Sequence, residues 1–213
     1  MEKKQQLINF WKEKLKLRDI ELKAFNEIKR ENFILKENKE EAYHDTPLPL
    51  LRGKTISQPT TVMIMTLALD LMPGEKVFEI GTGSGYQAAI TAHIIGKKGK
   101  LVSTEVIPEL VQFAKTNLMK SNIDNVTVLE EDGSNGCKDL APYDKIIITA
   151  ACSKFPEPLL EQLKPGGIIV GPVGDENEQE MVKGVKGKDG KLELYFLGPF
   201  LFTPMYGKYG FID

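Results

Sequence analysis

A run of closely spaced glycines is the clearest sign of chemistry in this chain. Residues 79–86 read Glu79-Ile80-Gly81-Thr82-Gly83-Ser84-Gly85-Tyr86, directly after the apolar pair Val77-Phe78. Glycines that end a buried strand let the backbone turn sharply and approach a ligand, because glycine lacks Cβ and tolerates positive φ. Glu105 follows 20 residues after Gly85, and an acidic residue ending the next strand can accept hydrogen bonds from both ribose hydroxyls. The pattern indicates a nucleotide site.

The spacing of the glycines indicates which nucleotide is bound. A dinucleotide fingerprint reads G-x-G-x-x-G, whereas here the position of its third glycine is Tyr86. This disfavours NAD and FAD, and it favours S-adenosylmethionine, whose cationic amino-acid end Glu79 could face. We therefore predict that Glu79, Gly81, Thr82, Gly83 and Glu105 bind this cofactor. A simple turn between a strand and a helix remains the alternative interpretation of the glycines.

A second acidic position follows a later apolar run. Asp132-Gly133 comes after residues 126–130, and open parallel sheets bind ligands beyond the carboxyl ends of their strands. An adenine amino group needs an acceptor and its ring nitrogen needs a donor, which an Asp side chain and the next N–H can supply. We predict that Asp132 and Gly133 bind the adenine, although an Asp-Gly pair taken alone is equally typical of a turn.

Other kinds of site do not match the spacing. Ser84 has Thr82 and Tyr86 where a hydrolase nucleophile elbow needs glycines, and Gly53-Lys54-Thr55 has Leu48 where a P-loop needs its first glycine. The two cysteines and two histidines show no metal-ligand spacing, so no metal site is expected. With only His44 and His93 available, the sequence favours chemistry that needs no general base.

Alternating strand and helix patterns indicate how these residues are positioned. From residue 75 onward Val- and Ile-rich runs alternate with helical segments, which predicts a parallel sheet with helices on both faces. Two runs at 181–186 and 192–197 flank an Asp-Gly turn and predict a C-terminal antiparallel hairpin. Upstream we expect two amphipathic helices within residues 7–28, an ordered loop over 40–58 and a buried helix over 59–72. The predicted strands and helices of the core are 76–80, 86–95, 101–104, 108–118, 126–130, 145–149, 156–163 and 168–172.

Bulk composition limits the class of protein. A chain of 213 residues that is 41% hydrophobic can bury one full core, and its net charge of −2 gives no general attraction for nucleic acid or an anionic membrane. No apolar stretch of about 18 residues and no signal-peptide pattern occurs. We expect a monomeric cytoplasmic protein forming a single domain over 1–213, with helices and a substrate loop in 1–74 and the cofactor-binding core and hairpin in 75–213.

Several segments together resemble the protein-L-isoaspartate O-methyltransferase family. The most specific is Thr55-Ile56-Ser57-Gln58-Pro59 beside Pro47-Leu48-Pro49, and the glycine run and Asp132-Gly133-Ser134 also match. The resemblance implies a Rossmann-like class I methyltransferase fold with a mostly parallel seven-stranded sheet. It also implies methyl transfer from S-adenosylmethionine to the free α-carboxylate of L-isoaspartyl residues in damaged proteins and peptides. By the same resemblance Ser57 is the active-site residue and Thr55 contributes to the cofactor site.

The hypothesised reaction agrees with the scarcity of histidines, because a carboxylate with a pKa near 4 is already an anion at neutral pH. The chain nevertheless departs from the family pattern. Lys54 replaces the usual glutamine, Leu51 replaces a glycine, and the C-terminal arginine motif appears as Leu201-Phe202-Thr203-Pro204-Met205. These departures concern the recognition of the peptide rather than the binding of the cofactor. The alternatives are a methyltransferase of the same fold acting on RNA or a small metabolite, and a cofactor-binding protein without catalysis.

Overall fold

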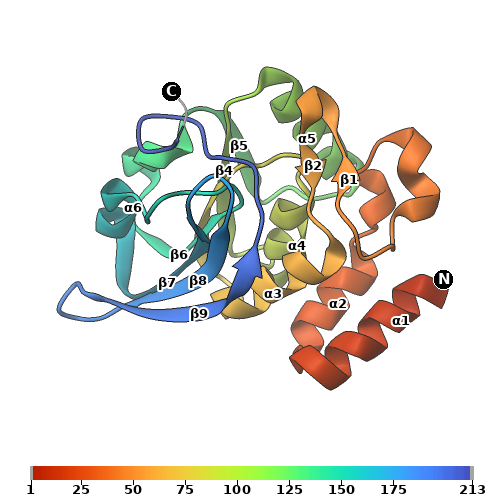
Figure 1. Cartoon of the computed structure of the whole chain (residues 1–213), viewed down its shortest axis with the longest axis horizontal. Coiled ribbons are helices and arrows are strands. Elements are labelled where there is room, and N and C mark those ends of the chain that lie inside the picture. The colour runs from red at the N-terminus through yellow and green to blue at the C-terminus, as the bar shows by residue number, and fades with distance from the viewer. Residues whose placement is uncertain (1, 212–213) are drawn as a thin grey trace.

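A mixed seven-stranded sheet forms the centre of the molecule (Figure 1). The computed structural model describes residues 2–211. The strand order is β5-β4-β3-β6-β7-β8-β9. The first five strands in this order are parallel, and β8 and β9 are antiparallel to their neighbours. Their bounds are β3 Lys76–Ile80, β4 Lys100–Glu105, β5 Val126–Glu130, β6 Tyr143–Ile148, β7 Leu163–Gly174, β8 Gln179–Lys186 and β9 Leu192–Phe200.

Apolar side chains cover both faces of the sheet, as the continuous Val and Ile runs predict. Val77 and Ile147 belong to the core on one face, while Phe78, Ile146 and Ile148 belong to the core on the other. Alternate residues of a strand point to opposite faces, so a strand buried on both sides needs apolar residues throughout. The first core includes residues of α3 Pro59–Leu69, α4 Tyr86–Ile95 and α5 Pro108–Lys120, and the second includes Leu159 of α6 Glu157–Gln162.

The predicted C-terminal hairpin is present. Strands β8 and β9 pair antiparallel, and the turn between them is closed by a hydrogen bond from the Gly187 amide to the Lys191 carbonyl (2.8 Å). Strand β9 continues to Phe200, beyond the expected end at Leu197. Its continuation brings residues 201–211 back over the carboxyl edge of the parallel strands (Figure 1).

The N-terminal helices complete the larger core. Helix α1 Glu2–Phe10 runs into a π-helical turn, Trp11–Leu15, and α2 Asp19–Glu27 follows. Trp11 is fully buried against Phe25, with 4.6 Å between the ring centroids, and its indole N–H donates to Thr60 Oγ1 (2.8 Å) at the start of α3. These contacts fix the N-terminal helices beside α3, next to the loop that carries Ser57.

Helix α3 and the loop before it also differ from the sequence expectation. The helix expected to continue to Met72 ends at Leu69, because Asp70 adopts a left-handed conformation (φ 50°). The loop expected over 40–58 contains two very short strands, β1 Leu48–Pro49 and β2 Thr55–Ile56, which pair antiparallel around Leu51–Gly53. Strands of two residues are too short to leave a periodic pattern. Within residues 2–211 no helix has the length and apolar character needed to cross a membrane.

Candidate active site

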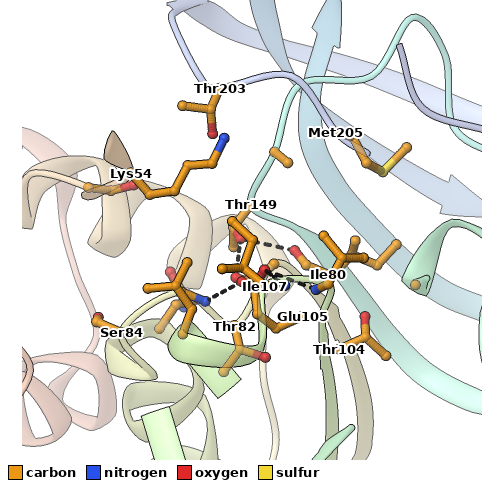
Figure 2. Close-up of a pocket in the computed structure, with 18 of the residues that line it drawn as sticks. Lys54, Ile80, Thr82, Ser84, Thr104, Glu105, Ile107, Thr149, Thr203 and Met205 are labelled. Atoms are coloured by element: carbon orange, nitrogen blue, oxygen red, sulfur yellow. Dashed lines mark hydrogen bonds between the residues drawn. The ribbon is translucent and has the colours of Figure 1, made fainter. Parts of the chain in front are cut away.

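A cavity lies at the carboxyl ends of β3 and β4, where an open parallel sheet is expected to bind its ligand (Figure 2). Seven parts of the chain form its wall: the Ser57 loop, helix α3, the glycine loop with the start of α4, the end of β4, the turn after β5, the segment after β6 and the segment after β9. The lining residues are Lys54, Thr55, Ile56, Ser57, Val62, Met65, Ile80, Gly81, Thr82, Gly83, Ser84, Tyr86, Gln87, Thr104, Glu105, Val106, Ile107, Leu110, Glu131, Gly133, Thr149, Ala150, Thr203, Pro204, Met205 and Tyr206.

The glycine loop is held by backbone hydrogen bonds. The amides of Gly81 and Thr82 both donate to the Thr104 carbonyl, at 2.9 and 3.0 Å. Gly81 has φ +89°, and a Cβ at this position would come within 2.5 Å of Thr149 Oγ1. The Thr149 hydroxyl in turn donates to the Ile80 and Gly81 carbonyls, at 2.9 and 2.6 Å. Glycine is required at position 81 both for its conformation and for its small size.

Glu105 lies where the ribose-binding prediction placed it, at the end of β4 and in the cavity wall. Its carboxylate accepts hydrogen bonds from the amides of Gly83 (2.9 Å), Val106 (3.0 Å) and Ile107 (3.1 Å). These donors fix the orientation of the side chain while one edge of it borders the cavity (Figure 2). The carboxylate is thus preorganised to accept hydroxyl hydrogen bonds.

Glu79 is placed differently from the expectation that it faces the ligand. Its side chain is completely buried and is not among the cavity-lining residues of the described chain. It accepts a hydrogen bond from Ser103 Oγ (2.5 Å), and Ser103 Oγ lies 2.6 Å from Thr82 Oγ1, which borders the cavity. Burial raises the pKa of Glu79 to about 8, and the neighbouring Glu105 adds to this effect. The carboxylate therefore lies beside Ser103 of strand β4, behind Thr82 as seen from the cavity.

Oε1 of Glu79 is a buried oxygen without a hydrogen-bond partner among the described residues. An unsatisfied buried acceptor is costly and calls for an explanation. The raised pKa of Glu79 lessens this cost, because a neutral carboxyl group is less costly to bury than a carboxylate. The other oxygen, Oε2, is the one that Ser103 and Thr82 connect to the cavity wall.

The two residues of the Asp-Gly pair after β5 have different positions. Gly133 borders the cavity, and a Cβ there would collide with Thr104 Oγ1 at 2.1 Å. Asp132 is not among the lining residues of the described chain. One of its oxygens accepts from the Ser134 amide (2.8 Å) and the other from the Lys208 amide (2.9 Å). The carboxylate holds the C-terminal turn beside the cavity, a contact between residues 76 positions apart.

Ser57 and Thr55 lie in the wall opposite the glycine loop. The Ser57 carbonyl accepts a hydrogen bond of 2.8 Å from Arg30 Nη2. Arg30 is fully buried, and its guanidinium lies 5.0 Å from the centre of the Tyr86 ring. Burial lowers the pKa of this guanidinium. Arg30 therefore holds the backbone of the Ser57 loop in place. The sequence pattern gave no indication of this role.

A C-terminal wall, residues 203–206, was not predicted as part of the site. The Ala151 amide donates to the Thr203 carbonyl (2.9 Å), and the Met205 amide donates to the Ala151 carbonyl (2.8 Å). These bonds place the segment across the cavity from the Ser57 loop. The similarity of Leu201-Phe202-Thr203-Pro204-Met205 to a family motif was the one signal that could have indicated this role.

The histidines lie away from the cavity. His44 is in contact with Lys3 on the surface, and His93 Nε2 lies 3.4 Å from Glu27 Oε2. Cys152 is buried, and its thiol lies 3.6 Å from the Pro172 carbonyl, so it is a packed residue. Residues 2–211 contain no group of three or more His, Cys, Asp or Glu side chains arranged to bind a metal. The side chains that border the cavity are suited to forming hydrogen bonds with a ligand and to orienting it.

The sheet, its helices on both faces and the glycine loop at the strand ends define a class I methyltransferase fold. The structure superposes on a solved protein-L-isoaspartate O-methyltransferase with a TM-score of 0.87 and 30% identity, covering 97% of this chain and 67% of that one. A putative protein-L-isoaspartate O-methyltransferase from Plasmodium falciparum, solved with S-adenosyl-L-homocysteine, has a TM-score of 0.82 and 24% identity, with 94% and 97% coverage. The second comparison supports the fold.

The chain belongs to the protein-L-isoaspartate O-methyltransferase family. The model of the family described as Protein-L-isoaspartate(D-aspartate) O-methyltransferase (PCMT) matches residues 1–210. Protein-L-isoaspartate O-methyltransferase 2 of Archaeoglobus fulgidus is 45% identical over 210 residues, which cover 99% of this chain and 95% of that protein. The family expected from the sequence motifs is confirmed.

Proposed function

We propose that this protein transfers the methyl group of S-adenosylmethionine to the free α-carboxylate of L-isoaspartyl residues in proteins and peptides. The observation that carries the proposal is the single cavity shared by the glycine loop and the Ser57 loop. Family membership supports the same reaction, and the P. falciparum protein was solved with the demethylated form of this cofactor. When bound, S-adenosylmethionine supplies an electrophilic methyl group.

The residues of the cavity fit this cofactor. Glu105 would hold the ribose hydroxyls, and the backbone of Gly81, Thr82 and Gly83 would contact the rest of the nucleoside, because none of the three positions blocks access with a large side chain. Gly133 would border the adenine, with Asp132 acting through the turn that it holds. Thr55 would contribute from the opposite wall. Glu79 would neutralise the cationic end through the Thr82 and Ser103 contacts.

Ser57 is the proposed catalytic residue. The acceptor carboxylate is already ionised at neutral pH, so no side chain needs to remove a proton. The task of the site is to hold one carboxylate oxygen in line with the methyl group and to exclude water. A neutral hydroxyl such as that of Ser57 orients an oxygen without strongly reducing its nucleophilicity. The Arg30 hydrogen bond to the Ser57 carbonyl keeps this hydroxyl at the cavity wall.

The same proposal assigns tasks to the parts of the chain. Residues 1–74 supply the loop that contacts the substrate, and residues 75–213 bind the cofactor and add the C-terminal wall. We expect the active form to be a monomer. The net charge of −2 favours a polypeptide over nucleic acid as the second substrate. Cys137 and Cys152 are free thiols, as expected in the reducing cytoplasm.

The decisive test uses two peptides that differ at one residue. One contains L-isoaspartate and the other contains ordinary L-aspartate, and transfer of a labelled methyl group from S-adenosylmethionine is measured. We expect the isoaspartyl peptide alone to be methylated. Equal transfer to both peptides, or no transfer to either, would contradict the proposal. In the second case RNA and small carboxylic acids would be tested as acceptors with the same labelled donor.

A further inference from the structure

Lys54 is the one positively charged side chain among the described residues that line the cavity. The other charged lining residues are Glu105 and Glu131. Glu105 is occupied by three backbone amides at the end of β4. A substrate that carries a carboxylate into this cavity therefore meets a single cationic group, and that group belongs to the Ser57 loop.

The position of Lys54 is set by the C-terminal wall. Its ammonium donates to the Tyr206 hydroxyl (3.2 Å) and lies 4.6 Å from the centre of the Tyr206 ring. Figure 2 shows the side chain extending from the Ser57 loop toward Thr203, above the glycine loop. Lys54 thus joins two walls of the cavity through residues 152 positions apart.

This arrangement leaves the charge of Lys54 available. No carboxylate of the described residues lies within ion-pair distance of its ammonium, although eight such pairs occur elsewhere in residues 2–211. An ammonium has three donors, and Tyr206 accepts one of them. The aromatic ring favours the cation without neutralising it. Two donors and a full positive charge remain for a ligand at the cavity mouth.

We propose that Lys54 binds the acceptor α-carboxylate of the isoaspartyl residue and determines specificity for this anion, an inference that rests on the proposed function. One carboxylate oxygen accepts from the Lys54 ammonium, and the other remains free to react. In the transfer, a lone pair of the free oxygen forms the new bond to the methyl carbon. The carbon–sulfur bond breaks and its electron pair stays on sulfur, giving a neutral ester and a neutral thioether. No proton is transferred.

The charge change explains why a lysine suits this position. The acceptor is an anion before the reaction and an uncharged ester after it, so attraction to Lys54 is present for the substrate and absent for the product. An ammonium also withdraws charge from the oxygen that it binds. Lys54 is therefore expected to increase affinity for the peptide substrate, while contributing little to the rate of the bound complex.

A carboxylate could also come from the methionine part of the cofactor. The two sources share the same chemistry, so the experiment measures them separately. The variants are Lys54→Met, which removes the charge, and Lys54→Arg, which retains it. Lys76→Met is the matched control, because Lys76 also packs over a tyrosine ring, that of Tyr143 (5.6 Å to the ring centre), but does not line the cavity.

Three quantities are measured for each variant. Steady-state assays give KM and kcat with the isoaspartyl peptide. Calorimetry gives the Kd of S-adenosylhomocysteine. Calorimetry on the protein loaded with S-adenosylhomocysteine also gives the Kd of the isoaspartyl peptide and of an analogue whose α-carboxylate is replaced by a carboxamide. Circular dichroism verifies that each variant is folded, and Lys54→Gln, which also removes the charge, provides the test if Lys54→Met does not fold.

For Lys54→Met we expect KM for the peptide to rise about 5- to 20-fold, with kcat within about twofold and the cofactor Kd unchanged. Wild type should bind the carboxylate peptide more tightly than the carboxamide, and Lys54→Met should bind the two equally. Lys54→Arg should restore most of the preference, and Lys76→Met should behave as wild type. An unchanged KM in Lys54→Met, or a weakened cofactor Kd alone, would overturn the inference. Wild type that fails to methylate the peptide would instead refute the proposed function.

Discussion

The two sides of the cavity are built in different ways. On the cofactor side, the loop amides of Gly81 and Thr82 bond to the Thr104 carbonyl, and Glu105 accepts from Gly83. These contacts join the ends of two neighbouring strands through backbone groups and the Glu105 carboxylate. On the proposed substrate side, the Ser57 loop is held by the side chain of Arg30, and Lys54 reaches Tyr206 in the C-terminal wall. The first side depends on contacts between neighbouring strand ends, and the second depends on side chains that come from distant parts of the chain.

This difference predicts how substitutions separate into classes. Changes on the cofactor side should weaken cofactor binding, and changes on the substrate side should alter turnover or peptide affinity while cofactor binding is preserved. The four variants below test the comparison.

Gly81→Ala should have the largest effect. Its Cβ would lie 2.5 Å from Thr149 Oγ1 at a φ of +89°, so both steric overlap and backbone strain oppose the native loop. We expect affinity for S-adenosylhomocysteine to fall about 100-fold or more, measured by calorimetry. Gly190→Ala is the matched control, because Gly190 has φ +83° and no atom near its Cβ position. It should retain cofactor affinity, and an equal loss in both variants would contradict the explanation.

Glu105→Ala comes next. Loss of a charged hydrogen-bond acceptor is worth roughly 1.5–3 kcal/mol, or about 10- to 150-fold in the Kd of S-adenosylmethionine. Glu130→Ala is the control, since Glu130 pairs with Glu105 in register at the end of β5 but is exposed and outside the cavity wall. Wild-type affinity in Glu105→Ala, measured by titration calorimetry, would remove this residue from the cofactor site.

Ser57→Ala should lower turnover rather than cofactor binding. Loss of the orienting hydroxyl is expected to reduce kcat for the isoaspartyl peptide about 10- to 100-fold, with the Kd of S-adenosylhomocysteine unchanged. The assay is kcat at saturating peptide, with Ser121→Ala as a control, because Ser121 accepts a hydrogen bond from Asn32 (3.2 Å) outside the cavity. Undiminished kcat in Ser57→Ala would exclude Ser57 from the mechanism.

Glu79→Gln should have the smallest and most specific effect. Burial raises the folded-state pKa of Glu79 to about 8 from 4.5, so between these values the folded protein retains a proton that the unfolded chain releases. The cofactor-free protein should therefore lose stability as pH rises through this window. Glutamine cannot ionise, so the Tm of the variant minus that of wild type should increase by about 2 °C or more from about pH 5 to about pH 8. A difference independent of pH would contradict the placement of a protonated Glu79.

Much of the fold could be predicted because its signals are local. The strands β3 and β5 and the helix α4 have the bounds expected from their apolar patterns, and the Asp-Gly turn marks the hairpin between β8 and β9. Elements that depend on few residues were missed, as with the two-residue strands β1 and β2. The early end of α3 depends on one residue, Asp70, in a left-handed conformation.

The candidate site was predictable to the same extent. Glycine spacing and the acidic residue after the next strand identified the positions that line the cofactor side, because backbone turns and strand ends follow from short stretches of sequence. The predicted cofactor roles of Glu79 and Asp132 stay predictions, and the contacts that these two residues make could not be predicted. Glu79 contacts Ser103 on the neighbouring strand, and Asp132 holds the turn at Lys208. Neither contact follows from the spacing of residues alone.

The sequence by itself determined the sheet, the glycine loop, the cofactor class and the family, because each depends on local backbone preferences or on contiguous motifs. Only the tertiary structure decided which residues meet across the cavity. Arg30 beneath Ser57, Lys54 against Tyr206, and residues 203–206 beside Ala151 are brought together by packing between segments far apart in the chain. Contacts of this kind depend on how the whole core closes, and no short stretch of sequence contains that information.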